Sequence, residues 1–354
     1  IVLGPFVLNL INTELTQTTP AITTVALSFI AFNIGKEFTI PLLERHGTQY
    51  VILAVFESTL TWVLVTLSAW LIFGLSFIAS LILGSIGAAT AVAATFLVIE
   101  QFEAKGNLTD TILAVVALDD AYVIIAFALA ASFAVPFQAG EGSVIAGIAF
   151  GLLEIVIAIG IGLVAGFITL FTMRWAVKSF NQLIVLLGAI LVTAGVSLLL
   201  EASPLLSNIA LGAVIASSKR QAEHLLYIVE EFAQPIYLLF FVLAGAALNF
   251  VILYAVGLLA IGYFIARIIG KYFGAYLGAI FSRSPKEVKN WLGVTLLPQA
   301  GLPIGLALVA IELFPDFGPV IANIIIGSTV IYELVGPLLI EFALGKVGEI
   351  KTNG

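Results

Sequence analysis

Long apolar segments, separated by short polar or turn-rich breaks, run through the whole chain. Eleven of them are long enough to predict membrane-spanning helices: residues 20–43, 48–73, 77–100, 109–133, 144–173, 179–200, 203–218, 232–248, 251–281, 290–312 and 316–345. Residues 1–11 have the pattern of a helix end, and because the chain opens at Ile1 we expect that first helix to be incomplete. The pattern predicts an all-α polytopic membrane protein with about 11 to 12 transmembrane helices.

The composition agrees with this fold class. Hydrophobic residues make up 61% of the 354 residues and charged residues only 10%, more apolar surface than a soluble core of this length uses. The chain has no cysteine, which excludes disulfides, thiolate metal sites and cysteine nucleophiles. Its two histidines, His46 and His224, both lie in polar stretches, so we expect no histidine metal site. We also expect no cofactor and no nucleic-acid partner.

The basic residues divide the loops into two sides. Twelve of the fourteen lysines and arginines fall on one side of the predicted membrane, namely Lys36, Arg45, Lys105, Arg174, Lys178, Lys219, Arg220, Arg283, Lys286, Lys289, Lys346 and Lys351. Loops on the opposite side carry acids or neutral polar residues, for example Glu14, Glu141, Glu201 and Asp316. The positive-inside rule therefore predicts a cytoplasmic C-terminus. Residues 219–231 have an amphipathic pattern, which we interpret as a connector along the cytoplasmic interface.

Two neighbouring aspartates, Asp119 and Asp120, lie halfway along the predicted span 109–133. A charge within the hydrocarbon costs about 2.5 to 3.5 kcal/mol, so such residues usually face a protein interior or a water-filled path. Two adjacent carboxylates repel each other and burial disfavours their charged forms, which makes at least one a candidate to exchange a proton near neutral pH. Their oxygens are also suitable ligands for a monovalent metal cation such as Na⁺ or K⁺. Competition between a proton and a cation for one group is the minimum that an antiporter requires.

The two remaining basic residues, Arg267 and Lys271, lie inside the span 251–281 and project from one face of it. At this depth they need a partner inside the protein, and the two aspartates are the leading candidates. An alternative interpretation is that these four residues form buried ion pairs without a role in transport. Three single acids within spans, Glu57, Glu154 and Glu333, we interpret as structural or secondary.

Two spans are poor helices at their centres. Residues 77–100 contain Leu-Gly-Ser-Ile-Gly-Ala-Ala-Thr and residues 290–312 contain Leu-Pro-Gln-Ala-Gly-Leu-Pro. Transporters place such interruptions at the membrane midplane, where helix ends and carbonyls line the ion site. The expected lining residues are Gly87, Ala89, Pro298, Gln299, Gly301 and Pro303. The matched positions suggest an inverted repeat. Alternatively, such glycines only provide close packing, as we interpret the pairs Gly147/Gly151 and Gly162/Gly166.

Several of these segments resemble the cation:proton antiporter superfamily, specifically its bacterial sodium(potassium)/proton exchanger branch with paired aspartates. The most specific one is Ala117-Leu-Asp-Asp120; the others are Leu3-Gly-Pro, Phe29–Glu37, Ser207–Ser217, Phe232-Ala-Gln-Pro, Phe240–Gly245 and Leu297-Pro-Gln-Ala-Gly. The resemblance covers nearly the whole chain. It implies a sodium/proton-antiporter-like fold with two broken crossing helices, in the inner (plasma) membrane, as a homodimer.

By position, the resemblance implies Asp120 as the ligand of the cation and the proton. Asp119 is then its neighbour, paired with a basic residue; the spacing to Gln299 favours Lys271, and Arg267 stays open as the partner. Thr90 is expected at the crossing of the broken helices, close to the ion. Proton exchange for Na⁺ or K⁺ is expected to follow an elevator mechanism, in which an ion-binding core moves against a scaffold.

The resemblance also suggests how the chain divides between core and scaffold. The expected parts are scaffold helices in 1–43, a first core half in 48–133, a linker helix in 144–173, scaffold and dimerisation helices in 179–249, and a second core half in 251–345. No soluble regulatory domain is expected within these residues.

Three other functions fit the residues less well. An intramembrane aspartyl protease needs one aspartate from each of two facing helices, whereas Asp119 and Asp120 are adjacent in one helix and point about 100° apart. A sodium-coupled symporter for an organic anion, on a similar inverted-repeat fold, would use Lys271 and Arg267 to bind its substrate. A passive channel is disfavoured because a titratable pair beside internal cations would trap ions.

Overall fold

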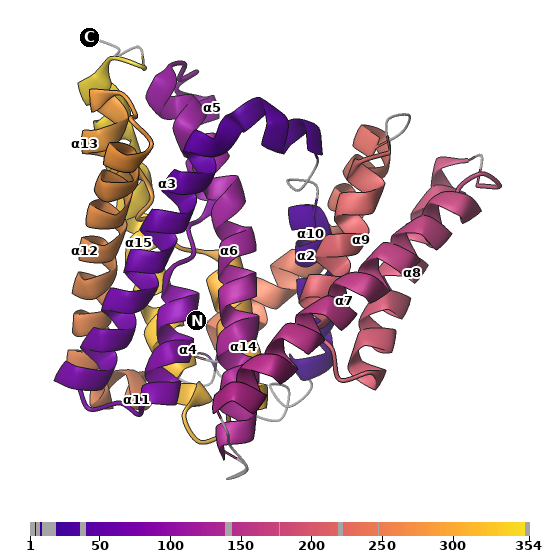
Figure 1. Ribbon diagram of the computed structural model, residues 1–354, viewed down its shortest axis with the longest axis horizontal. Helices are drawn as coiled ribbons and strands as arrows, with labels where there is room; N and C mark the ends of the chain where they lie inside the picture. The colour runs from indigo at the N-terminus through magenta and orange to yellow at the C-terminus, as the bar shows by residue number, and fades with distance from the viewer. Residues whose placement is uncertain are drawn as a thin grey trace. The chain divides into compact units, whose positions relative to one another are not determined.

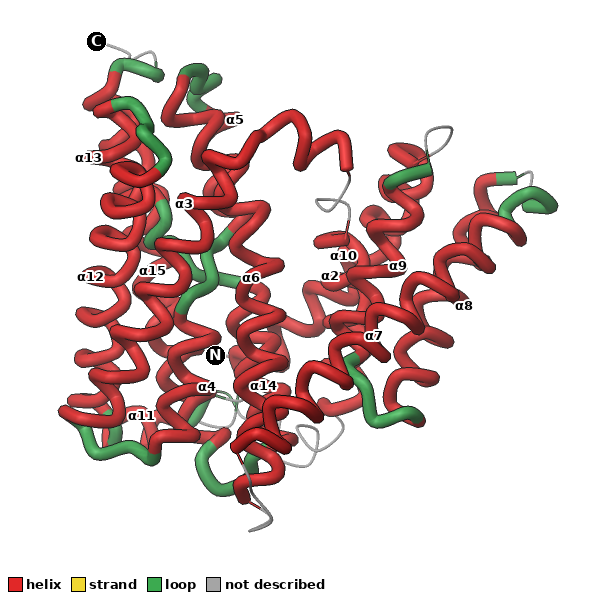
Figure 2. The backbone as a smooth tube through the Cα atoms, viewed as in Figure 1, coloured by secondary structure: helices red, strands yellow, loops and turns green. Residues whose placement is uncertain are grey.

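The computed structural model describes residues 4, 8, 19–35, 40–138, 144–176, 178–218, 222–246 and 248–350. All regular secondary structure in these ranges is helical (Figures 1 and 2). Seven of the described helices are long and apolar enough to cross a membrane, and several shorter apolar helices accompany them. The predicted all-α polytopic membrane fold is therefore confirmed. The expected first-helix remnant in residues 1–11 lies outside the described residues, apart from Gly4 and Leu8.

The helices divide into two compact units, which we describe separately. Unit 1 comprises Ile1–Arg45 and Ala128–Ala247, and unit 2 comprises His46–Phe127 and Leu248–Gly354. These limits fall close to those of the predicted scaffold and core segments, and the linker segment 144–173 belongs to unit 1. The roles of scaffold and core remain predictions.

Unit 1 is a helical bundle built around the short helix α9 (Pro204–Ala216), which contacts α2 (Thr19–Gly35), α7 (Val144–Thr172) and α8 (Ser179–Leu199). The helix α10 (Ala222–Ala246) packs on the same group. Gly166 of α7 lies so close to α9 that an added Cβ would come within 2.6 Å of the Val214 Cβ. Close approach of α7 and α9 therefore needs small residues, as in other membrane helix pairs.

Unit 2 contains the long helices α6 (Asn107–Gln138), α12 (Gly257–Phe281) and α15 (Gly318–Val347) and most of α3 (Ile40–Leu67), whose backbone leaves the helical conformation at Gly47. Helix α3 continues as a π-helical turn, Ser68–Ile72, and α6 runs past residue 127 into unit 1. A short helix α11 (Phe250–Ala255) precedes α12. An apolar core is formed where α3, α5, α6, α12, α13 and α15 meet; its members include Leu53, Leu108, Ile112, Ala275, Leu292 and Leu344.

Both predicted interruptions are present in unit 2. The first separates α4 (Phe77–Gly87) from α5 (Val92–Gln101), and the second separates α13 (Lys286–Thr295) from α14 (Gly301–Leu313). Figure 2 draws both as loop segments between helices. The second break follows from its sequence, since Pro298 has no N–H to continue a helix. These breaks place the free ends of four short helices inside a membrane protein, where each backbone group needs a partner.

Two sequence-based boundaries are wrong. Residues 222–231 do not form a separate connector, because α10 runs without interruption from Ala222 to Ala246 and continues through Pro235. The predicted span 251–281 is two helices, α11 and α12, joined at Val256. The side chain of Asn249 starts α11 by accepting hydrogen bonds from the N–H groups of Val251 and Ile252.

Candidate ion-binding site

A stripe of glycines on α12 brings α3 unusually close to it. Gly270, Gly274 and Gly278 are spaced by four residues, so they share one face of the helix. A Cβ added to Gly270 would lie 2.6 Å from the Thr61 Cα, and one added to Gly274 would lie 2.5 Å from the Glu57 Cα. This close approach places Glu57 next to Lys271, which lies on the same helix as the glycines.

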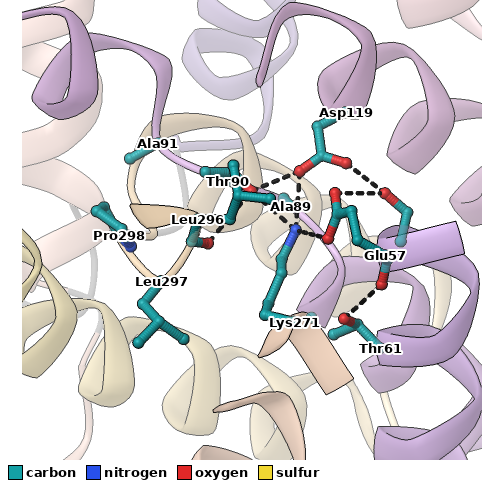
Figure 3. A network of polar contacts seen from close by, with 12 residues as sticks. Glu57, Thr61, Ala89, Thr90, Ala91, Asp119, Lys271, Leu296, Leu297 and Pro298 are labelled. Carbon is teal, nitrogen blue, oxygen red and sulfur yellow. Dashed lines mark hydrogen bonds and ion pairs between the residues drawn. The ribbon is translucent and has the colours of Figure 1, made fainter. Parts of the chain in front are cut away.

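The ammonium group of Lys271 is the centre of the buried charges (Figure 3). Its Nζ lies 2.8 Å from Asp119 Oδ2 and 2.7 Å from Glu57 Oε2. It also donates a hydrogen bond of 2.8 Å to Thr90 Oγ1. The side chains of Lys271, Glu57 and Asp119 are all 0% exposed. One lysine of α12 is therefore shared by a carboxylate of α3 and a carboxylate of α6.

Hydroxyl groups complete the surroundings of Asp119. Thr90 Oγ1 donates to Asp119 Oδ2 at 2.5 Å, and Ser58 Oγ contacts Asp119 Oδ1. Ser58 Oγ also lies 3.0 Å from Glu57 Oε1. Each carboxylate of the pair thus meets Lys271 through one oxygen and Ser58 through the other. We call Glu57, Ser58, Thr90, Asp119 and Lys271 the Lys271 cluster.

The charges of the Lys271 cluster do not cancel when every group is ionised, because two carboxylates share one ammonium. Moving a charge from water into a protein interior costs several kcal/mol, so pairing and hydrogen bonding must offset most of that cost. A bound proton or monovalent cation would neutralise the remaining negative charge. Asp120 lies next in the chain and is 6% exposed, whereas Asp119 is 0% exposed. The arrangement suits reversible binding of a small positive charge.

Arg267 is also fully buried, one helical turn from Lys271, but its guanidinium is bound by backbone carbonyls. Nε donates to Gly87 O at 2.8 Å, Nη1 to Leu297 O at 2.6 Å and Nη2 to Ala89 O at 2.6 Å. The guanidinium also lies over the ring of Tyr332, with 4.4 Å between Cζ and the ring centroid. No ion pair of Arg267 with an acid is found among the described residues. Arg267 joins the two helix breaks to each other.

The two breaks also contact each other directly. Ala91 N donates to Pro298 O at 2.9 Å, and Thr90 Oγ1 lies 3.4 Å from Leu296 O. Gln299 is 0% exposed and exchanges hydrogen bonds with the Tyr263 hydroxyl at 2.9 and 3.0 Å. The expected lining residues Gly301 and Pro303 lie in the first turn of α14, directly after this crossing. The crossing therefore adjoins the Lys271 cluster through Thr90.

The structure brings together most of the residues singled out from the sequence. Asp119, Thr90 and Lys271 contact one another, and Gly87, Ala89 and Pro298 lie at the crossing beside Arg267. Of the two basic residues proposed as partners of Asp119, Lys271 forms the ion pair with it. Glu333 lies on α15 outside the Lys271 cluster, facing outward, and Glu154 belongs to unit 1.

Glu57 and Ser58 were missed as members of the site. A single acid in an apolar span gave no reason to rank Glu57 above Glu154 or Glu333. A signal was present, because Glu57, Ser58 and Thr61 form a polar group within one span while α12 carries three glycines at four-residue spacing. Together they indicate a close helix pair with polar contents.

Among the described residues, no group of three or more histidine or acidic side chains is arranged to hold a metal ion. A cation bound at Asp119 and Asp120 would be a transported substrate.

A buried, oppositely charged cluster beside two crossed helix breaks defines a class of protein: a secondary transporter that binds its ion within the membrane. The family comparison then identifies the chain more closely. The family described as "Sodium/hydrogen exchanger, transmembrane" matches residues 1–346, so this chain belongs to the sodium/hydrogen exchanger family. Members of this family are transporters and not enzymes. Cation/proton antiport is accordingly its class of activity.

Solved structures agree on the fold. The structure of the sodium proton antiporter MjNhaP1 from Methanocaldococcus jannaschii at pH 8 matches with a TM-score of 0.72 and 20% identity, covering 97% of this chain and 90% of that one. An electron-microscopy map of the same antiporter gives a TM-score of 0.69 and 18% identity, covering 99% and 90%. A search of curated protein sequences found no match. At these identities the likeness shows the fold alone.

Proposed function

We propose that this protein exchanges protons for a monovalent cation, Na⁺ or K⁺, with Asp120 and Asp119 as the ion-binding groups. The observation that carries the proposal is the Lys271 cluster, in which Lys271 neutralises only one of two buried carboxylates. Membership of the sodium/hydrogen exchanger family supports the same activity, because exchange of a cation for a proton is the activity of that family.

Lys271 is the built-in competitor of the transported cation in this mechanism. Its ammonium group lies 2.8 Å from Asp119 Oδ2. A cation that arrives at Asp119 and Asp120 weakens this ion pair, and Glu57 remains as a second partner for the ammonium group at 2.7 Å. A proton bound to the same carboxylates excludes the cation, which couples the two fluxes. Thr90 holds Asp119 in position from the crossing.

Access to the site would alternate by an elevator movement. Unit 2 contains both helix breaks and the Lys271 cluster, so it is the part proposed to carry the ion, with unit 1 as the scaffold. We also propose that the protein works as a homodimer in the inner (plasma) membrane, with its C-terminus in the cytoplasm. The positions of the basic loop residues support this orientation.

The organic-anion symporter is less consistent with the geometry. Such a transporter would need basic side chains that can receive the substrate's negative charge. Lys271 is already bound to two carboxylates, and the guanidinium of Arg267 is bound to four backbone carbonyls. Neither group is available for an anion without loss of these contacts.

The test is exchange in proteoliposomes that hold a pH gradient, with a fluorescent dye reporting the gradient. Adding Na⁺ or K⁺ is expected to collapse it, and organic anions are expected to have no effect. Repeating the titration at several pH values is expected to raise the apparent KM for the cation as the pH falls, because protons occupy the same carboxylates. An apparent KM that is constant from acid to alkaline pH would contradict the shared site.

A further inference from the structure

The N-terminus of α6, the helix that carries Asp119 and Asp120, is capped by a side chain from the far end of the chain. Glu349 Oε1 accepts a hydrogen bond from Leu108 N at 2.8 Å, and its Oε2 accepts from Thr109 N at 2.7 Å. The Thr109 hydroxyl donates a third bond to Oε2, also at 2.7 Å. We call this arrangement the Glu349 cap.

The surrounding chain is shaped for the Glu349 cap. Helix α15 ends at Val347 and is followed by Gly348, whose φ of 79° belongs to the left-handed region that favours glycine. Glu349, the next residue, reaches the start of α6. Lys105 N donates to Glu349 O at 3.1 Å, which adds a backbone bond between the two segments. At Gly106, an added Cβ would overlap the Glu349 side chain, so only glycine leaves room for the carboxylate.

The Glu349 cap satisfies a need that every helix has. The first turn of an α-helix leaves N–H groups without intrahelical partners and carries partial positive charge, which a carboxylate stabilises. A cap normally comes from a residue next to the helix, usually serine, threonine, aspartate or asparagine. Here it comes from a position 241 residues away from Leu108. The cap therefore links the end of α15 to the start of α6.

Helix α6 is therefore held to the rest of unit 2 at two levels. Halfway along it, Asp119 is bonded to Lys271 of α12, and at its start Leu108 and Thr109 are bonded to the end of α15. Helix α15 in turn contacts α12, α13 and α14. A shift of α6 along its axis would break both the Glu349 cap and the ion pair between Asp119 and Lys271. The cap therefore helps to keep Asp119 at its distance from Lys271.

We propose that Glu349 is a positioning residue for ion exchange: the Glu349 cap fixes the axial position of α6, and thereby holds Asp119 and Asp120 at the crossing. This inference rests on the proposed antiport. It assigns a part in ion binding to a residue roughly 15 Å or more along α6 from the aspartates, since Thr109 and Asp119 are ten residues apart. Without the cap, the first turn of α6 loses its hydrogen bonds to Glu349, and the apolar packing of Leu108 and Ile112 is what remains at that end.

The experiment compares Glu349→Ala and Glu349→Gln with the native protein in the proteoliposome assay, with kcat and KM determined separately. The glutamine variant keeps one carbonyl acceptor, so it should retain part of the cap and also serves if the alanine variant does not fold. Glu287→Gln is the matched control: Glu287 is an acid at the start of the unit 2 helix α13, but it is exposed and belongs neither to the Lys271 cluster nor to the Glu349 cap.

We expect the KM for the cation to rise about threefold to tenfold in Glu349→Ala and by a smaller factor in Glu349→Gln, the size usual for coupling through a packed network. Glu287→Gln should match the native protein. A purely structural role would lower the amount of active protein, and so the apparent kcat, at unchanged KM; that result would overturn the proposal. No exchange by the native protein would instead contradict the proposed function itself, whereas native exchange with an unchanged KM in both Glu349 variants contradicts only the cap.

Discussion

Units 1 and 2 bury their polar groups in different ways. Every buried charged side chain among the described residues belongs to unit 2: Glu57, Asp119, Asp120, Arg267 and Lys271. In the described part of unit 1 the buried polar side chains are neutral, such as Thr193, Ser197, Ser207 and Asn208. These side chains mostly bond to their own helix or to one neighbour, as Ser197 Oγ does with Ser207 Oγ at 2.8 Å.

The difference between the units shows that unit 2 is the part in which buried charges lower the stability of the protein. Buried charges are expensive, and replacing them with well-packed apolar residues is often neutral or stabilising in other proteins. Their concentration in one unit, at the contact of two helix breaks, is therefore best explained by a function for them. The described part of unit 1 buries no charged side chain, as the proposed scaffold role would require. The comparison yields predictions that separate ion binding from packing.

The largest effect is expected for Asp120→Asn. The amide has nearly the same shape as the carboxylate but can neither take up a proton nor carry the charge that attracts a cation, so exchange should be abolished while the protein still folds. The proteoliposome assay measures the loss, and gel filtration in detergent checks the fold. Glu333→Gln is the control, because Glu333 also lies within a span but outside the Lys271 cluster. Substantial exchange by Asp120→Asn would remove the central assignment.

Lys271→Ala should cause the next largest effect, on stability. It leaves Glu57 and Asp119 buried without the ammonium group, and removing one partner of a buried ion pair typically costs about 3 to 5 kcal/mol. Thermal unfolding in detergent should show the loss. Adding Glu57→Gln to Lys271→Ala removes one of the uncompensated charges and should recover part of the stability. If the double variant is less stable than Lys271→Ala, the two carboxylates do not share the lysine as the distances indicate.

The sequence was a good guide to this site where a residue type is rare in a given setting. Adjacent aspartates inside an apolar span, and glycine or proline at span centres, stand out along the chain, so the buried position of Asp119 and both helix breaks could be predicted. The role of Asp120 as the ion ligand stays a prediction. The partner of Asp119 was narrowed to Lys271 or Arg267. Their different contacts depend on a one-turn difference in depth, which places Arg267 at the carbonyls of Gly87, Ala89 and Leu297.

Glu57 and Glu349 could not be assigned in the same way, since their roles depend on contacts distant in sequence. Glu57 acquires its role from the glycines of α12, which lie about 200 residues later and let the two helices approach. In the sequence, Glu349 is one acid in a polar C-terminal stretch. Only the structure shows that, after the turn at Gly348, its side chain caps α6. The start of α10 was misread because the amphipathic pattern of residues 219–231 suggested a surface connector, whereas the helix is continuous from Ala222 to Ala246.

A smaller effect is expected from two matched glycine substitutions. In unit 2, Gly274→Ala places a Cβ at 2.5 Å from the Glu57 Cα, so α3 and α12 must separate, at a cost of about 1 to 3 kcal/mol. The KM for the cation should rise as well, because Glu57 moves away from Lys271. In unit 1, Gly188 of α8 has no atom within 4 Å of an added Cβ. Gly188→Ala should be neutral or slightly stabilising, since alanine favours a helix. Equal effects of both substitutions on KM would contradict the division of roles.

The smallest effect is expected in unit 1 from Tyr237→Phe. Asn33 Nδ2 of α2 donates a hydrogen bond of 2.8 Å to the Tyr237 hydroxyl of α10, and this bond links the two helices. Its removal should lower the free energy of unfolding by about 1 kcal/mol, the usual net contribution of one such bond. Thermal unfolding in detergent measures the loss, and the proteoliposome assay should give an unchanged KM. Tyr263→Phe is the matched change in unit 2, because it removes the bonds between Tyr263 and Gln299 at the crossing. If the unit 1 variant altered KM as strongly as the unit 2 variant, ion binding would not be confined to unit 2, and the contrast between a charged core and a neutral scaffold would lose its functional meaning.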